Sequence, residues 1–343
     1  GKKYATFEKA YAAAADNGTI TLLANCESGR INLEDKSIQV VLNGYTLTST
    51  ADYGVMFCAK NGNTVTINGT KTGSKLVGTL MVTSKTYGHI VMNGGTYESS
   101  LYCPVYINGA SVGASSLTIT NAVITGTNGG SVALYLAGPS TNTITNTTIT
   151  GEVTGIELRA GTLTIDNCTV NGGKGELTVS ANGSGTTVEN AAIAVSQHNT
   201  KLETVVTINS GTFSGTAALY QVNTLTGATA EELAKVKLDV KGGTFKGIVN
   251  ADTVTSFISG GTFTSEIAGA YCAGRAHRRR AGCPAGAAAQ RPFPEPQPRA
   301  GSGKDPEQRG RLHLLEGKLA AAVSGKQVPP AVAHLPAVRL FCH

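Results

Sequence analysis

The sequence predicts an all-β solenoid, a parallel β-helix of about ten coils, and three observations support this. A short strand ending in an apolar residue recurs ten times between positions 38 and 265 at similar intervals. Glycine or asparagine stands two positions later in nine of ten copies, and a second apolar residue stands five positions later in nine of ten. Such a short unit cannot bury its apolar face alone, so successive units must stack.

The first apolar residue marks an inward-facing position of each coil. Its ten copies are Leu42, Ile67, Met92, Ile119, Ile144, Ile165, Val188, Ile208, Val240 and Ile258. A third short strand precedes each copy, so that three strands and three corners make one coil. The longest spacing, from Ile208 to Val240, predicts a loop that projects from one coil as a contact loop.

The residues two positions later predict sharp corners, because glycine and asparagine adopt the left-handed conformation at least cost. The glycines and asparagines among them are Gly44, Gly69, Gly94, Asn121, Asn146, Asn167, Asn190, Gly242 and Gly260. In stacked coils the four asparagines would lie above one another, each amide bonding to the next. A propeller would need blades of about 40 residues, and a sandwich would need hairpin signals, so neither fits the spacing.

Residues 1–19 predict a helical cap for one end of the solenoid, which occupies residues 20–272. Thr6 can cap the helix, Phe7, Ala10, Tyr11 and Ala14 form one apolar face, and Gly18 ends it. With this cap and the asparagine ladder, the chain resembles right-handed parallel β-helices of the pectate-lyase-like class, as found in bacterial secreted and cell-surface, adhesin-like proteins. The resemblance implies a right-handed coil and an extracellular or bacterial cell-surface location.

Residues 273–343 differ in composition from the rest of the chain. Residues 1–272 contain 44 threonines and carry a net charge of −2 (16 basic against 18 acidic residues), whereas the tail has no threonine and a net charge of +8 (12 against 4). We expect a poorly ordered tail, and our hypothesis is that it is the translation of a shifted reading frame. It shows no nucleic-acid-binding motif, so nucleic acid is not an expected partner. No apolar run is long enough to span a membrane, which excludes a transmembrane helix.

The resemblance invites an enzyme hypothesis, a polysaccharide lyase or glycoside hydrolase. Asp166 and Glu189 each follow their strand residue by one position, and on adjacent coils they would stack about 5 Å apart, at the spacing of a retaining glycosidase pair or of a cation site. Ca²⁺ is expected only under the lyase alternative. Otherwise no cofactor and no metal are expected, because the seven cysteines form no CxxC motif.

A second row of side chains favours ligand binding over catalysis. In the third strand of three consecutive coils, the outward positions are Tyr106, Tyr135 and Glu157, with Arg159 beside them. Tyrosine rings flanked by charged groups on a flat sheet suit sugar rings. The sequence therefore predicts a non-catalytic, adhesin-like surface module that binds a glycan or a host surface protein. The alternatives are the enzyme and a purely structural spacer.

Overall fold

The computed structural model describes residues 2–108, 113–127, 132–182, 184–264 and 267–268. All of them belong to one compact unit, Gly1–Gln297. The predictions for the tail, residues 273–343, lie outside the described residues. None of the described helices is long and apolar enough to cross a membrane.

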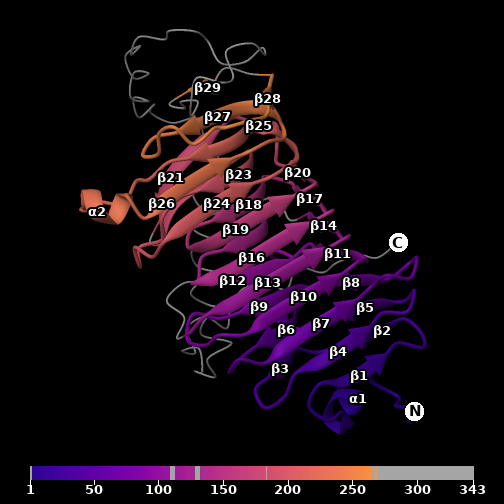
Figure 1. The fold of residues 1–343 in the computed structure, drawn as a ribbon. Coiled ribbons are helices and arrows are strands. Elements are labelled where there is room, and N and C mark those ends of the chain that lie inside the picture. The colour runs from indigo at the N-terminus through magenta and orange to yellow at the C-terminus, as the bar shows by residue number, and fades with distance from the viewer. Residues whose placement is uncertain (1, 109–112, 128–131, 183, 265–266, 269–343) are drawn as a thin grey trace, which may run out of the picture. The chain divides into compact units, whose positions relative to one another are not determined.

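The described residues form a parallel β-helix whose coils each contribute a strand to three faces (Figure 1). The first face is a nine-stranded parallel sheet, and Figure 1 shows its strands as stacked arrows from indigo to orange. Its strands are β1 (Gly18–Thr21), β4 (Ile38–Val41), β7 (Thr64–Asn68), β10 (His89–Asn93), β13 (Ser115–Thr120), β16 (Ser140–Thr145), β19 (Gly161–Asp166), β24 (Thr204–Ile208) and β26 (Val236–Val240).

The second face begins after the first corner of each coil. Its strands are β2 (Cys26–Ser28), β5 (Thr46–Ser49), β8 (Lys75–Val77), β11 (Thr96–Ser99), β14 (Val123–Gly126), β17 (Thr148–Gly151), β20 (Cys168–Asn171), the first parts of β25 (Gly211–Gln221) and β27 (Thr244–Ala251), and β28 (Thr262–Phe263).

The third face closes each coil. Its strands are β3 (Ile31–Leu33), β6 (Val55–Ala59), β9 (Thr79–Val82), β12 (Val105–Ile107), β15 (Val132–Leu136), β18 (Thr154–Leu158), β23 (Ala191–Val195), the last parts of β25 and β27, and β29 (Ile267–Ala268). A 3-10 turn, Asp52–Gly54, precedes β6.

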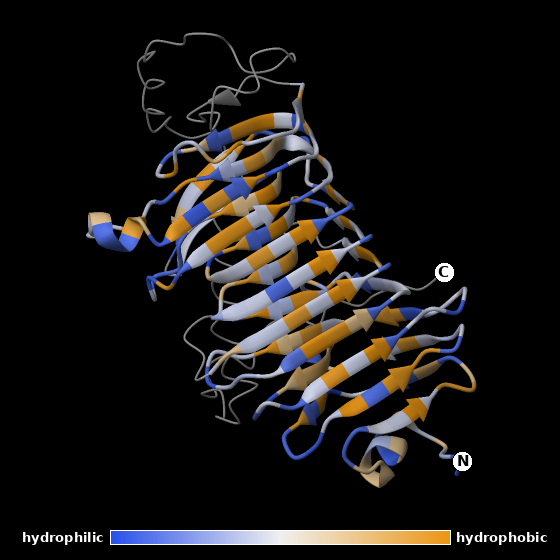
Figure 2. Ribbon diagram, viewed as in Figure 1, coloured by the Kyte–Doolittle hydropathy of each residue, from blue (hydrophilic) through white to orange (hydrophobic). Residues whose placement is uncertain are grey.

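Alternation along the strands builds the core. Figure 2 shows hydrophobic residues alternating with polar ones along the first face. Ile67, Met92 and Ile119 pair with one another across adjacent strands and are fully buried, as are Tyr97 and Ile124 of the second face. The predicted inward positions at these coils are therefore confirmed, and the coils share one continuous apolar interior.

The N-terminal cap helix forms as predicted except at its end, because it stops at Ala13 and Gly18 is the first residue of β1. Helix α1 (Phe7–Ala13) begins at Thr6, whose side chain accepts a hydrogen bond from the Lys9 amide. Phe7 is buried and meets the Phe57 ring edge-on at 5.7 Å. Ala10, Tyr11 and Ala14 also pack on the core. The helix thus covers the first coil.

Two of the ten predicted strand positions are wrong. Val40, rather than Leu42, pairs with Ile67, although Leu42 is also buried in the core. Val188 lies in an antiparallel hairpin formed by β21 (Thr178–Asn182) and β22 (Gly185–Glu189). Ile165 therefore pairs directly with Ile208.

The corner prediction holds for asparagine better than for glycine. Asn121, Asn146, Asn167 and Asn190 have φ of 49–67°, and Gly44 and Gly94 have φ of 86° and 67°. Gly69, Gly242 and Gly260 lie outside the left-handed region, and the prediction is wrong there. A Cβ at these three positions would approach backbone atoms of the neighbouring coil within 2.2–2.8 Å, so close coil packing requires glycine instead.

The asparagine amides bond in only one of the predicted steps. Asn167 Nδ2 donates to Asn146 Oδ1 at 2.8 Å. The Asn190 amide instead donates to the carbonyl oxygen of Glu176, because Asn190 follows the hairpin rather than a first-face strand.

The predicted contact loop between Ile208 and Val240 carries the short helix α2 (Ala230–Leu233), which has no buried residue and projects from the coils in Figure 1.

Candidate functional site

The predicted tyrosine row exists on the third face. Tyr106 pairs with Tyr135, and Tyr135 pairs with Glu157, on three consecutive strands. The two rings stack with centroids 5.1 Å apart, and the Arg159 guanidinium lies 5.2 Å from the Tyr135 centroid. The sequence thus identified four side chains that contact one another in series.

The exposure expected for this row is wrong. Tyr106, Tyr135, Glu157 and Arg159 are only 2%, 3%, 1% and 0% exposed. The Tyr102 ring packs on Tyr106 at 5.1 Å. A sugar ring therefore cannot stack on these tyrosines in this conformation, because their faces are already occupied by protein.

The β21–β22 hairpin covers the third face beyond Tyr135. It fills most of the chain between β20 and β23, where the preceding coil has only a short turn between β17 and β18. Val188 of the hairpin packs with Ala194 and Ala217 outside the main core. Strand alternation predicted that Glu157 points outward, but it could not reveal that a distant insertion folds over it.

Glu157 and Arg159 anchor this hairpin. Arg159 Nε donates to Glu157 Oε1 at 2.8 Å, and Nη2 lies 2.7 Å from the same oxygen. The guanidinium also donates to Asn182 Oδ1 at 3.2 Å and Thr187 Oγ1 at 2.9 Å, both in the hairpin. A buried charge needs a charged partner and hydrogen bonds. These four contacts give Arg159 a structural role between coil and hairpin.

His198 lies beside this cluster. Its backbone N–H donates to the Arg159 carbonyl at 2.8 Å, and its Nδ1 accepts from the Thr200 amide at 3.2 Å. Burial, together with the positive charge of Arg159, lowers the pKa of His198 to about 4. The ring is therefore neutral at physiological pH, which fits an accepting Nδ1.

The predicted carboxylate pair is not formed. Asp166 pairs with Thr145 on the first face, and its Oδ1 accepts from Ser210 Oγ at 2.6 Å. Glu189 belongs to the hairpin, where its Oε2 accepts from Thr178 Oγ1 at 2.6 Å. The stacking prediction fails because β22 pairs with β21 instead of joining the first face. Within the described ranges, no three His, Cys, Asp or Glu side chains gather as a metal site.

The second face carries a row that the sequence prediction missed. Its register aligns Thr46, Lys75, Thr96, Val123, Thr148, Thr169, Thr212, Thr244 and Thr262 on consecutive strands. None of these nine side chains is buried, and the last five are unbroken threonine. We call these five residues the threonine row. The signal was a threonine directly before the second inward residue in seven of these nine coils.

Comparison with known families supports the fold. Residues 104–217, about a third of the chain, match the family model described as "Right handed beta helix region". No significant match to a curated protein or to a solved structure was found. The match agrees with the stacked parallel strands, and the predicted right-handed β-helix is confirmed. It indicates a β-helix domain and specifies no substrate.

Proposed function

We propose that this β-helix is a non-catalytic, adhesin-like module of the extracellular or bacterial cell-surface environment, and that it binds an extended glycan along its second face. The threonine row carries the proposal. It replaces the tyrosine row as the binding surface, because none of its side chains is buried: Thr148 and Thr262 are exposed and the other three are partly exposed.

The threonine row is a preorganised set of polar groups. Branching at Cβ restricts the side-chain rotamers of threonine, so little entropy is lost when a ligand binds. Each hydroxyl can donate one hydrogen bond and accept others. A neighbouring row adds Thr150, Asn171 and Ser214 in register, with the Asn171 amide bonded to Thr150 Oγ1 at 3.3 Å.

The stacking of coils favours a polymer over a small molecule. Parallel strands lie ~4.8 Å apart, so equivalent hydroxyls recur at that interval along the solenoid. A chain of sugar hydroxyls lying along the axis would meet the same groups on each coil, and weak contacts would add over its length. None of the five side chains is charged, which favours a neutral glycan.

Binding to a glycan array and to insoluble polysaccharides tests the proposal. The variant Thr148→Val/Thr169→Val/Thr212→Val removes three hydroxyls while keeping side-chain shape and strand preference. We expect it to lose at least tenfold in glycan affinity, since each lost hydrogen bond contributes ~0.5–1.5 kcal/mol.

The first face supplies a matched control, Thr118→Val/Thr143→Val/Thr164→Val, which alters three threonines that are at least partly exposed on consecutive strands. This variant should bind like the wild type. An equal loss in both variants, or no glycan retained by the wild-type protein, would contradict the proposal and leave a protein partner or a structural spacer as the function.

A further inference from the structure

The β21–β22 hairpin has one covered edge and one open edge. The Val188 carbonyl of β22 accepts a hydrogen bond from Thr154 Oγ1 of β18 at 2.8 Å. The Thr186 carbonyl accepts another from Ser196 Oγ, directly after β23, at 2.9 Å. The β22 edge of the hairpin therefore faces the coils. The other edge is formed by β21, which pairs with no strand except β22 in the part of the chain that the structure describes.

The register of the hairpin identifies the backbone groups that face the open edge. Successive pairs in an antiparallel ladder alternate between hydrogen-bonded and non-hydrogen-bonded. Val179 lies opposite Val188, and Ala181 lies opposite Thr186. Both pairs are non-hydrogen-bonded, because the carbonyls of Val188 and Thr186 point toward the coils. The N–H and C=O groups of Val179 and Ala181 therefore point away from β22, and no described residue outside the hairpin bonds to them.

The side chains of β21 leave this edge accessible to another strand. Val179 is 39% exposed, which makes it one of the few large apolar side chains exposed among the described residues, and Ala181 is exposed as well. The strand Thr178–Asn182 contains no charged residue and no proline, and its register with β22 has no bulge. Lysine, proline and bulges are the features by which natural edge strands prevent pairing with other chains. The β21 strand has none of them.

We propose that β21 is a self-association site, at which two copies of this chain pair antiparallel through their β21 strands. A two-fold axis at Ser180 places Val179 of each copy opposite Ala181 of the other as a hydrogen-bonded pair. Two such pairs supply four backbone hydrogen bonds. The same axis places Thr178 opposite Asn182, so that every facing pair within the strand is uncharged. This self-complementarity favours a second copy over an unrelated strand as the occupant.

The contact between two β21 strands is small, so the dimer is weak. Each backbone hydrogen bond contributes little net free energy, and an interface of one short strand from each copy lies below the standard size for a stable complex. We expect a dissociation constant on the order of 0.1 mM. Sedimentation equilibrium of the full chain, at concentrations from about 10 µM to about 1 mM, should show a reversible equilibrium between monomer and dimer.

A charge on the open edge should prevent this pairing. Val179→Lys puts an ammonium group on each strand of the dimer, close to the two-fold axis, and should raise the dissociation constant at least tenfold. Val123→Lys is the matched control. It makes the same change at an exposed valine of β14, a strand paired on both edges, and should dimerise like the wild type. Circular dichroism checks that both variants are folded.

Disulfide cross-linking tests the register of the two strands. Ser180 lies on the proposed axis, where the Cα atoms of a non-hydrogen-bonded pair are ~4.5 Å apart, within the range that a disulfide spans. In a glutathione redox buffer, Ser180→Cys should cross-link two copies at least tenfold faster than Ala181→Cys, because position 181 faces position 179 rather than itself. Mass spectrometry of proteolytic peptides identifies the bond between the two introduced thiols and separates it from bonds of the natural cysteines.

Three results would overturn self-association through β21. A wild-type chain that stays monomeric at every concentration would leave the edge without the proposed occupant. A dimer that survives Val179→Lys would place the contact on another surface. Equal cross-linking rates for Ser180→Cys and Ala181→Cys would reject the two-fold register. None of these residues belongs to the threonine row, so each result leaves the glycan proposal to its own test.

Discussion

The outward rows of the second and third faces come from strands of the same solenoid, yet the threonines of one are at least partly exposed and the tyrosines of the other are buried. Both rows follow the same alternation of inward and outward residues. The difference arises outside the strands, where the Tyr102 ring packs on Tyr106 and the β21–β22 hairpin folds over Glu157 and Arg159. Facing away from the core of a β-helix is therefore not the same as being available to a ligand.

The largest loss of stability is expected when the buried ion pair between Glu157 and Arg159 is broken. Arg159→Leu would leave the Glu157 carboxylate buried without its charged partner, and we expect a loss of ~3–5 kcal/mol in the free energy of unfolding. Urea denaturation followed by circular dichroism measures it. The exposed pair Lys237–Glu203, at 2.7 Å, is the control: Lys237→Ala should cost at most ~1 kcal/mol. Equal effects of the two variants would contradict a structural role for Arg159.

The second-largest loss of stability is expected when a stacked tyrosine is truncated. Tyr106→Ala removes a ring that contacts both Tyr102 and Tyr135, and we expect it to cost ~3 kcal/mol, as truncation of a buried aromatic residue does. Thermal unfolding monitored by near-ultraviolet circular dichroism is the measurement. A variant as stable as the wild type would mean that Tyr106 is exposed in solution, which would restore the tyrosine row as a candidate binding surface.

Lowering the pH should cause an intermediate loss of stability, through the buried His198 beside the hairpin. The pKa of His198 falls from an ordinary value of 6.5 to about 4 on folding. Between these pH values the unfolded chain binds a proton that the folded chain does not. Stability should therefore decrease as pH falls from 6.5 to 4, by ~1–3 kcal/mol. His198→Asn should remove this part of the dependence in denaturation at pH 7, 5.5 and 4.5. An unchanged profile in His198→Asn would contradict the assignment.

The smallest change in stability is expected when a threonine of the second face is truncated. Thr169→Ala truncates a partly exposed side chain at the middle of a strand, and its stability should remain within ~0.5 kcal/mol of the wild type. The same urea denaturation measures it. A loss as large as that of Tyr106→Ala would show that the threonine row is packed rather than open to a ligand.

The sequence was most informative where a coil repeats without insertion. Ile119 and Ile144 could be placed in register, because corner residues such as Asn121 and Asn146 stand at a constant offset from them. The offset says nothing about which coil a strand joins, so Val188 was misplaced: its local pattern matches the repeat, but its partner is Val179 in the hairpin.

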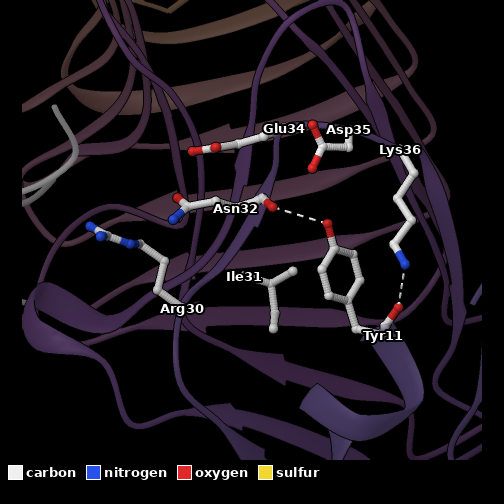
Figure 3. A pocket seen from close by; sticks show the side chains of 7 residues that line it. All are labelled: Tyr11, Arg30, Ile31, Asn32, Glu34, Asp35 and Lys36. Atoms are coloured by element: carbon white, nitrogen blue, oxygen red, sulfur yellow. Dashed lines mark hydrogen bonds between the residues drawn. The ribbon is translucent and has the colours of Figure 1, made fainter. Parts of the chain in front are cut away.

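Site prediction failed for a related reason. The Glu157–Arg159 pair is covered by the hairpin and Tyr106 is covered by Tyr102, and strand alternation carries no information about these contacts. The pocket between α1 and β3 (Figure 3) likewise combines Tyr11 with Asn32 and Asp35, which share no motif. The threonine row was accessible from the sequence, because its members occupy one fixed place in each coil.

The insertion that forms the hairpin also bears on how the solenoid assembles. Ile144 pairs with Ile165, and Ile165 pairs with Ile208, although the second pair is separated by about twice as much chain as the first. Doubling the length of a closed loop costs only ~0.6 kcal/mol of chain entropy. The corner between β20 and β23 therefore accepts the inserted segment at little cost in chain entropy, which a few hydrogen bonds between Arg159 and the hairpin can offset.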